Sequence, residues 1–269
     1  MIGAPSTDQP RGQRVSIWEM AAVCVAGIWA GAINTVVGSG TLITFPVLLA
    51  VGLPPVTANV SNALGLVPGS VSGAIGYRRE LKGQRARILR LGAVALVGSL
   101  AGAALLITLP PGAFELIVPA LIAVALVLVV LQPRLSRAMQ RRREQKDRRP
   151  PAHGGPTLLG GMGVASAYGG YFGAAQGVIY LALMGLLLPD DLQRINAVKN
   201  VLSAVVNGVA AVFFLFVAEF HWTAVLLIAV GSTVGGQLGA RIGRRLPPTV
   251  LRGVIVAVGL AAIIQLLLN

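Results

Sequence analysis

Long apolar runs separated by short polar intervals dominate the chain. Most runs approach or exceed about 20 residues, the length of helix that spans a bilayer. Two runs are only about 11–12 residues long, roughly 17–18 Å of helix at 1.5 Å per residue, which is too short to cross unaided. The pattern predicts an all-α polytopic membrane protein. Its expected segments are residues 17–36, 42–53, 56–77, 88–109, 114–131, 157–172, 178–188, 195–218, 222–242 and 250–268.

The first short segment follows a glycine-rich interruption, Gly38-Ser39-Gly40-Thr41. Glycine lets the backbone turn or approach a ligand closely, and the hydroxyl groups can cap a new helix. In lipid, irregular backbone survives only where it is buried in protein or lines a cavity. Short helices that meet at a polar break therefore indicate a transport site, and the second short segment predicts another break.

Composition supports this interpretation and limits the partners and cofactors to be expected. Of the 269 residues, 55% are hydrophobic and 12% charged, about half the charged share of soluble proteins. The net charge of +13 lies in short loops beside the segments, which favours anionic membrane lipids as partners over nucleic acid. Cys24 is the single cysteine, and no metal cluster, cofactor motif, catalytic triad or phosphate loop is visible.

The distribution of lysine and arginine predicts the topology. With five segments in each half and the N-terminus outside, all basic loops lie inside, whereas the loops near Pro54, near Pro110 and at 219–221 lie outside. Counting each broken pair as one crossing would instead place one basic loop outside. The basic loops contain Arg78, Arg79, Lys82, Arg85, Arg87 and Arg90; Arg134, Arg137, Arg141, Arg142, Arg143, Lys146, Arg148 and Arg149; and Arg241, Arg244, Arg245 and Arg252.

An odd number of segments per half makes the second half inverted relative to the first. We therefore expect two inverted repeats of about five helical segments each, with short or broken helices at the glycine-rich breaks. Leu53-Pro54 followed by Asn62 resembles Leu188-Pro189 followed by Asn200. The expected units are an N-terminal transmembrane repeat (1–132), a basic cytoplasmic linker (133–156) and a C-terminal transmembrane repeat (157–269). A homodimer is compatible with this organisation.

Several motifs resemble those of the sulfite exporter TauE/SafE family. They are Gly38-Ser39-Gly40 with Pro46, Gly52-Leu53-Pro54 with Ala58, Ser61-Asn62, and Ala197-Val198-Lys199-Asn200. The resemblance covers nearly the whole chain. It implies a multi-pass transporter of the bacterial inner membrane that exports sulfite, organosulfonates or related small anions.

Lys199 is the most informative single residue. A buried ammonium within a membrane usually faces a cavity or a counter-ion. One polar stripe at i, i+3 and i+4 spacing is formed by Asn196, Lys199, Asn200, Ser203 and Asn207. It continues deeper than a headgroup anchor needs, which favours function over snorkelling. The other expected substrate-binding residues are Asn34, Ser39, Thr41, Asn59, Ser61, Asn62, Tyr171 and Gln176.

These amides and hydroxyls suit the oxygens of a sulfite or sulfonate, and the N-termini of the short helices would add positive dipole ends. For each residue alone, the alternative is a helix–helix hydrogen bond. We expect a secondary transporter driven by proton-motive force. The rival hypotheses are an uptake carrier, a passive anion channel, an integral-membrane enzyme and a non-transporting scaffold.

Two further patterns concern helix packing and helix capping. Glycines four residues apart, such as Gly98 with Gly102 and Gly235 with Gly239, predict close helix packing. Asp190 and Asp191 are expected to cap the eighth segment, with Arg194 nearby.

Overall fold

A computed structural model describes residues 16–144 and 155–242, together with 253, 255–261 and 263–264. The described residues are helical, without strands. Five helices (α1, α4, α5, α8 and α9) are long and apolar enough to cross a membrane, so this is a multi-pass membrane protein. The helices are α1 (Ile17–Val36), α2 (Thr41–Ala50), α3 (Pro55–Gly76), α4 (Arg85–Thr108), α5 (Pro111–Glu144), α6 (Pro156–Tyr171), α7 (Gln176–Leu187), α8 (Leu192–Phe214) and α9 (Trp222–Ile242).

The predicted segments correspond to α1–α9 with small shifts at their ends, except for α5. This helix continues from the expected end at residue 131 to Glu144 and contains Pro133, so the first part of the predicted linker is helical. Residues 145–154 of that linker and much of the predicted segment 250–268 lie outside the described residues.

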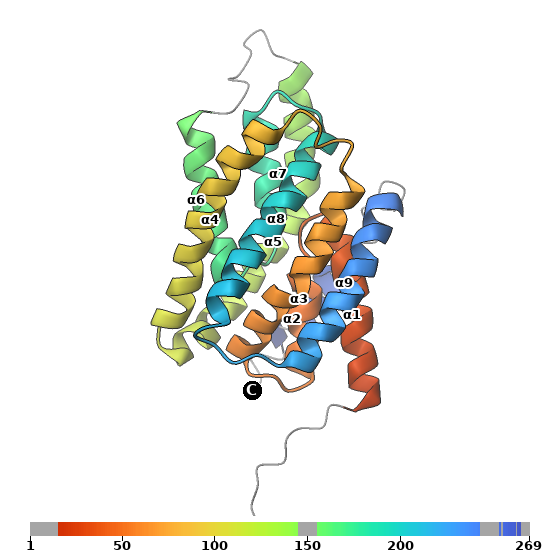
Figure 1. Cartoon of the computed structure of the whole chain (residues 1–269), viewed down its shortest axis with the longest axis vertical. Helices are drawn as coiled ribbons and strands as arrows, with labels where there is room; N and C mark the ends of the chain where they lie inside the picture. Colours follow the sequence, from red (N-terminus) through yellow and green to blue (C-terminus); the bar gives the residue numbers. More distant parts are fainter. Residues whose placement is uncertain (1–15, 145–154, 243–252, 254, 262, 265–269) are drawn as a thin grey trace, which may run out of the picture.

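Two parallel helix pairs flank a central antiparallel pair. In Figure 1, α1 and α9 lie on one side, α4 and α6 on the other, and α3 and α8 between them. The α1–α9 register is parallel because Gly27 faces Ile228 and Gly31 faces Ser232 one turn further along both helices. The short helices α2 and α7 occupy different heights of the bundle (Figure 1).

Small residues permit the parallel pairs, as the glycine spacing predicts. A Cβ atom on Gly102 would lie 1.9 Å from the carbonyl oxygen of Ala167, and one on Gly235 would lie 1.9 Å from that of Ile28. No side chain fits at these distances, so backbone meets backbone. Such contact holds the helices together by van der Waals attraction. This attraction is needed because lipid gives the helices no hydrophobic driving force to associate.

Replacement of Gly102 by alanine should destabilise the protein by about 1–3 kcal/mol, because the methyl group collides with the α6 backbone. Gly92→Ala in the same helix is the matched control, since a Cβ there meets nothing within 4 Å. Thermal unfolding in detergent should show a lower midpoint for Gly102→Ala alone. Equal midpoints for the two variants would contradict the close packing of α4 on α6.

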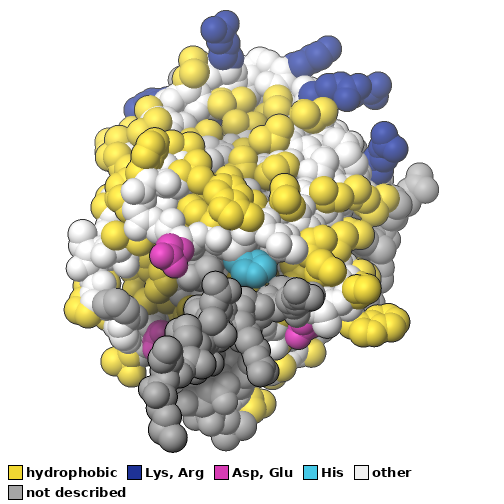
Figure 2. Space-filling model, turned by 60° about the horizontal axis from the view of Figure 1, so that its bottom comes forward, with side chains coloured by type: hydrophobic (Ala, Val, Ile, Leu, Met, Phe, Trp, Pro, Cys, Tyr) yellow, Lys and Arg dark blue, Asp and Glu magenta, His cyan; other side chains and the backbone are white. Residues whose placement is uncertain are grey.

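Contacts between loops define the two ends of the bundle. The side chain of Gln84, just before α4, donates to the carbonyl oxygen of Arg194 in α8 at 3.1 Å. At the opposite end, the backbone N–H of His221 donates to Ser61 Oγ at 3.0 Å. Lysine and arginine gather at one rim in Figure 2, whereas the face brought forward carries acids and a histidine. This separation agrees with the expected topology, in which the basic end is cytoplasmic.

The two halves share local features. Four residues separate α1 from α2 and four separate α6 from α7, and the second of each four is a glycine with positive φ, Gly38 (+89°) and Gly173 (+77°). Helix α1 packs on α9 as α6 packs on α4, and α3 packs on α9 as α8 packs on α4. These parallels favour an inverted repeat, which stays a prediction.

Candidate functional site

The two helix breaks touch each other. The backbone N–H of Gly177 donates to the carbonyl oxygen of Gly38 at 3.0 Å. A Cβ on Gly38 would lie 2.4 Å from the Cα of Gly177, so a larger residue at either position would separate the breaks. Residues 37–40 and 172–175, distant in sequence, therefore belong to one centre.

Lys199 lies at this centre and binds the C-terminal end of α1. Its Nζ donates to the carbonyl oxygens of Asn34 (2.6 Å) and Thr35 (3.0 Å), and its side chain is 0% exposed. The amides of Asn196 and Asn200 also donate to Thr35 O, at 3.2 and 3.3 Å. The predicted stripe on α8 therefore caps a helix end whose negative dipole favours a cation. Complete burial excludes snorkelling to the headgroups.

Helix α3 forms comparable contacts around both breaks. The amide of Asn59 donates to the carbonyl oxygen of Tyr171, the last residue of α6, at 2.9 Å. The amide of Asn62 donates to Thr41 Oγ1 at 3.2 Å, and Thr44 donates its hydroxyl to Asn62 Oδ1. Asn59, Asn196 and Asn200 thus satisfy helix-end carbonyl groups contributed by the opposite half of the chain. Asn62 instead contacts side chains of α2, in its own half.

Several buried polar atoms at the centre have no hydrogen-bond partner among the described residues. They are Ser39 Oγ, Tyr171 OH, Thr35 Oγ1 and the amide oxygens of Asn196 and Asn200. A buried polar group without a partner costs about 1–3 kcal/mol, so such a concentration indicates a place for a ligand or water. The N-termini of α2 and α7 also have no side-chain cap.

Two predicted site residues have other contacts. Ser61 accepts the hydrogen bond from His221 at the end of the bundle remote from the basic loops. The amide nitrogen of Asn34 donates to Ser70 Oγ at 3.1 Å, and only its carbonyl oxygen contacts Lys199. Ser61 therefore lies away from the breaks in this structure, whereas Asn34 packs its Cβ against Gly40 and directs its amide to α3.

Gln176 begins α7, but its side chain donates to Tyr180 OH at 2.7 Å, and that hydroxyl contacts Ser166 Oγ at 2.6 Å. Tyr180 lies at i+4 from Gln176, so the helical spacing in the sequence could have predicted this hydrogen bond. Thr35 was also missed, because it contributes a backbone carbonyl group that any residue would offer. Thr44, which donates to Asn62 Oδ1, was not among the expected site residues.

The residues that the structure describes contain no group of three or more His, Cys, Asp or Glu side chains that could hold a metal ion. The chemistry of the centre is instead that of one ammonium group, amides, hydroxyls and helix ends. This set can bind and release an anion, but it offers no general acid–base pair of carboxylates or imidazoles.

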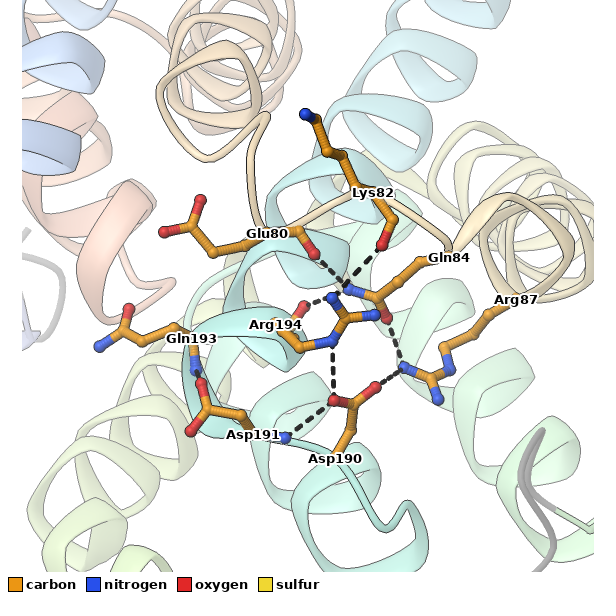
Figure 3. Close-up of polar contacts among 8 residues, drawn as sticks. All are labelled: Glu80, Lys82, Gln84, Arg87, Asp190, Asp191, Gln193 and Arg194. Carbon is orange, nitrogen blue, oxygen red and sulfur yellow. Dashed lines mark hydrogen bonds and ion pairs between the residues drawn. The ribbon is translucent and has the colours of Figure 1, made fainter.

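A polar network lies at the basic end of the bundle (Figure 3). Asp190 lies 2.5 Å from Arg87 of α4 and 2.9 Å from Arg194 of α8. Asp191 caps α8 by accepting from the N–H of Gln193 at 2.8 Å, so the expected cap is confirmed. Arg194 precedes Lys199 by five residues, about 7.5 Å along the helix. Movement of this end of α8 would therefore also shift Lys199.

The network makes stability depend on the charge of Asp190. Burial alone would raise the pKa of Asp190, but the hydrogen bond from Arg87, that from the N–H of Asp191, and the charges of Arg87 and Arg194 together lower this pKa. A lowered carboxyl pKa stabilises the fold above the ordinary value of about 3.9, and this contribution disappears as the pH falls through the folded-state pKa.

Asp190→Asn should lower the free energy of unfolding at pH 7 by about 1–3 kcal/mol, because the two arginines lose a charged acceptor. The deficit should be constant from pH 7 to pH 5 and shrink below about pH 4. Thermal midpoints across this range measure both effects. Glu219→Gln, at an exposed acid, is the control, and an equal deficit there would contradict the role of the network.

A multi-pass protein whose described residues are helical, and in which two broken helices meet at a buried polar centre, has the architecture of a membrane transporter. The comparison of sequences gives the family. The profile of the sulfite exporter TauE/SafE family matches residues 23–266, and the chain belongs to this family.

Curated relatives carry transporter names. The chain is 28% identical over 230 residues to "Probable membrane transporter protein YfcA" of Escherichia coli (strain K12), covering 85% of this chain and 82% of that protein. It is 27% identical over 248 residues to "Probable membrane transporter protein ORF9" of Sinorhizobium sp, covering 92% of each. A "Probable membrane transporter protein" of Haemophilus influenzae is 27% identical over 236 residues, covering 87% of this chain and 88% of that protein. No solved structure matches significantly. Family and relatives support membrane transport rather than enzymatic activity.

Proposed function

We propose that this protein exports small sulfur-containing anions, sulfite or organosulfonates, across the bacterial inner membrane, driven by proton-motive force. The observation that carries the proposal is the fully buried ammonium of Lys199 at the junction of two helix breaks, whose residues include hydroxyls without a partner among the described residues. The family name supplies the sulfur chemistry. The basic loops supply the expected orientation.

The charge balance of the centre favours an anion. An ammonium group has three N–H bonds, and two of those on Lys199 are engaged by carbonyl oxygens of α1. Asp190 forms ion pairs with Arg87 and Arg194, whereas Lys199 has no ion pair with the described residues. An isolated charge in a membrane is costly, so an anionic substrate would stabilise the centre.

The substrate oxygens would be held by three kinds of donor. The third N–H of Lys199 supplies charge, the hydroxyls of Ser39 and Tyr171 supply neutral hydrogen bonds, and the uncapped N-termini of α2 and α7 supply dipoles. Lys199 is sealed from solvent in this structure. Transport therefore requires alternating exposure, with the Asp190 network opening when the site faces the cytoplasm.

Lys199→Met should abolish transport, because it removes the charge and keeps most of the side-chain volume. The assay is efflux from proteoliposomes loaded with sulfite or ethanesulfonate, with and without a pH gradient. Val212→Ala, at an exposed position further along the same helix, is the control and should retain wild-type flux. Normal efflux by Lys199→Met would refute the site.

The same assay separates the mechanisms. Gradient-dependent flux supports a proton-coupled exporter, whereas gradient-independent flux would identify a uniporter or passive channel. Absence of flux for both sulfur anions would contradict the proposed substrate class.

Tyr171→Phe separates a binding role from a structural one. The Tyr171 hydroxyl has no partner among the described residues, so its removal should leave the thermal midpoint unchanged. If this hydroxyl binds the substrate, the KM for transport should rise about 10-fold or more, as for the loss of a hydrogen bond to a charged group. An unchanged KM would exclude the Tyr171 hydroxyl from the site.

A further inference from the structure

An apolar groove runs between α3 and α8 on the outside of the bundle. Its volume is about 460 Å³. It begins at the basic end of the molecule, where α3 ends, and continues along α8 beyond Lys199. Its lining residues are Val71, Ala74, Ile75, Arg78, Leu81, Val201, Ala204 and Val205.

One cation lies at the basic end of this groove. Arg78 is exposed, and its guanidinium makes no hydrogen bond or ion pair with the part of the chain that the structure describes. Arg87 and Arg194 of the same end are instead engaged by Asp190. Arg78 is therefore available to an anion from outside the protein.

A second groove provides an internal comparison. It lies between α4 and α6, has a volume of about 570 Å³, and is lined by apolar residues and glycine without a charged side chain. A neutral acyl chain would suit both grooves, whereas an anionic headgroup would find a cation only at the α3–α8 groove.

We propose that the α3–α8 groove is a binding site for an anionic phospholipid, with an acyl chain along the apolar lining and the phosphate on Arg78. An apolar channel that ends in a cation at the membrane surface complements such a lipid, because the acyl chain gains van der Waals contacts along the groove and the phosphate gains a charged contact with Arg78. This site is separate from the transport centre, and its existence does not depend on the proposed transport.

Charge favours a lipid over a second copy of the chain in this groove. Near Arg78, the basic end also carries Arg79, Lys82, Arg85 and Arg90. A symmetric dimer through the groove would bring these two sets of cations together, which is repulsive. An anionic lipid would neutralise them.

The test measures lipid retained by the purified full-length protein, using native mass spectrometry after exchange into phosphatidylglycerol or phosphatidylethanolamine. The wild type should retain phosphatidylglycerol preferentially. Arg78→Ala should reduce that retention about five-fold, as expected for one phosphate contact. Arg79→Ala, at the adjacent exposed arginine outside the groove, should retain nearly wild-type levels.

A second variant tests the apolar part of the site. Ala204→Leu narrows the groove without touching Arg78 and should also reduce phosphatidylglycerol retention. Equal losses for Arg78→Ala and Arg79→Ala would indicate general surface charge and overturn the proposal. Equal retention of the two lipids, unchanged retention by Ala204→Leu, or a dimer that Ala204→Leu disrupts would overturn it as well.

Discussion

The polar centre depends on one requirement: helix ends inside a membrane must have their carbonyl groups satisfied by protein, because lipid offers no donors. The end of α1 meets this requirement through Lys199, Asn196 and Asn200 of α8. The end of α6 meets it through Asn59 of α3. Each broken helix is thus completed by the other half of the chain, and the fold brings both breaks together.

This arrangement explains why structural and functional roles coincide at the centre. Lys199 stabilises a helix end, yet it also brings a positive charge to the junction of the two breaks, where Ser39 Oγ has no partner among the described residues. The same helix α8 carries Arg194 in the network at the basic end and part of the apolar lining of the α3–α8 groove. Motion of α8 relative to α1 would therefore change the position of the Lys199 charge, the access to the site and the contacts along the α3–α8 groove together.

The sequence predicted the helical segments, both breaks and the importance of Lys199, because hydropathy, glycine clusters and a membrane charge are visible in composition. It could not predict that Lys199 binds Thr35, since a backbone carbonyl has no residue signature and the contact is long-range. Ser61 was grouped with Asn62 by proximity in sequence, but its hydroxyl accepts from His221 at the far end. The extension of α5 through Pro133 was missed because proline usually ends a helix.

The most direct test of an anion site at Lys199 is ¹⁵N NMR of the lysine side chains. The chain contains only Lys82, Lys146 and Lys199, so the spectrum is simple and Lys199→Arg assigns the buried signal. Titration with sulfite or ethanesulfonate should shift the Nζ resonance of Lys199 and leave those of Lys82 and Lys146 in place. An unchanged Lys199 resonance at anion concentrations that saturate transport would contradict a substrate site at the junction of the two breaks.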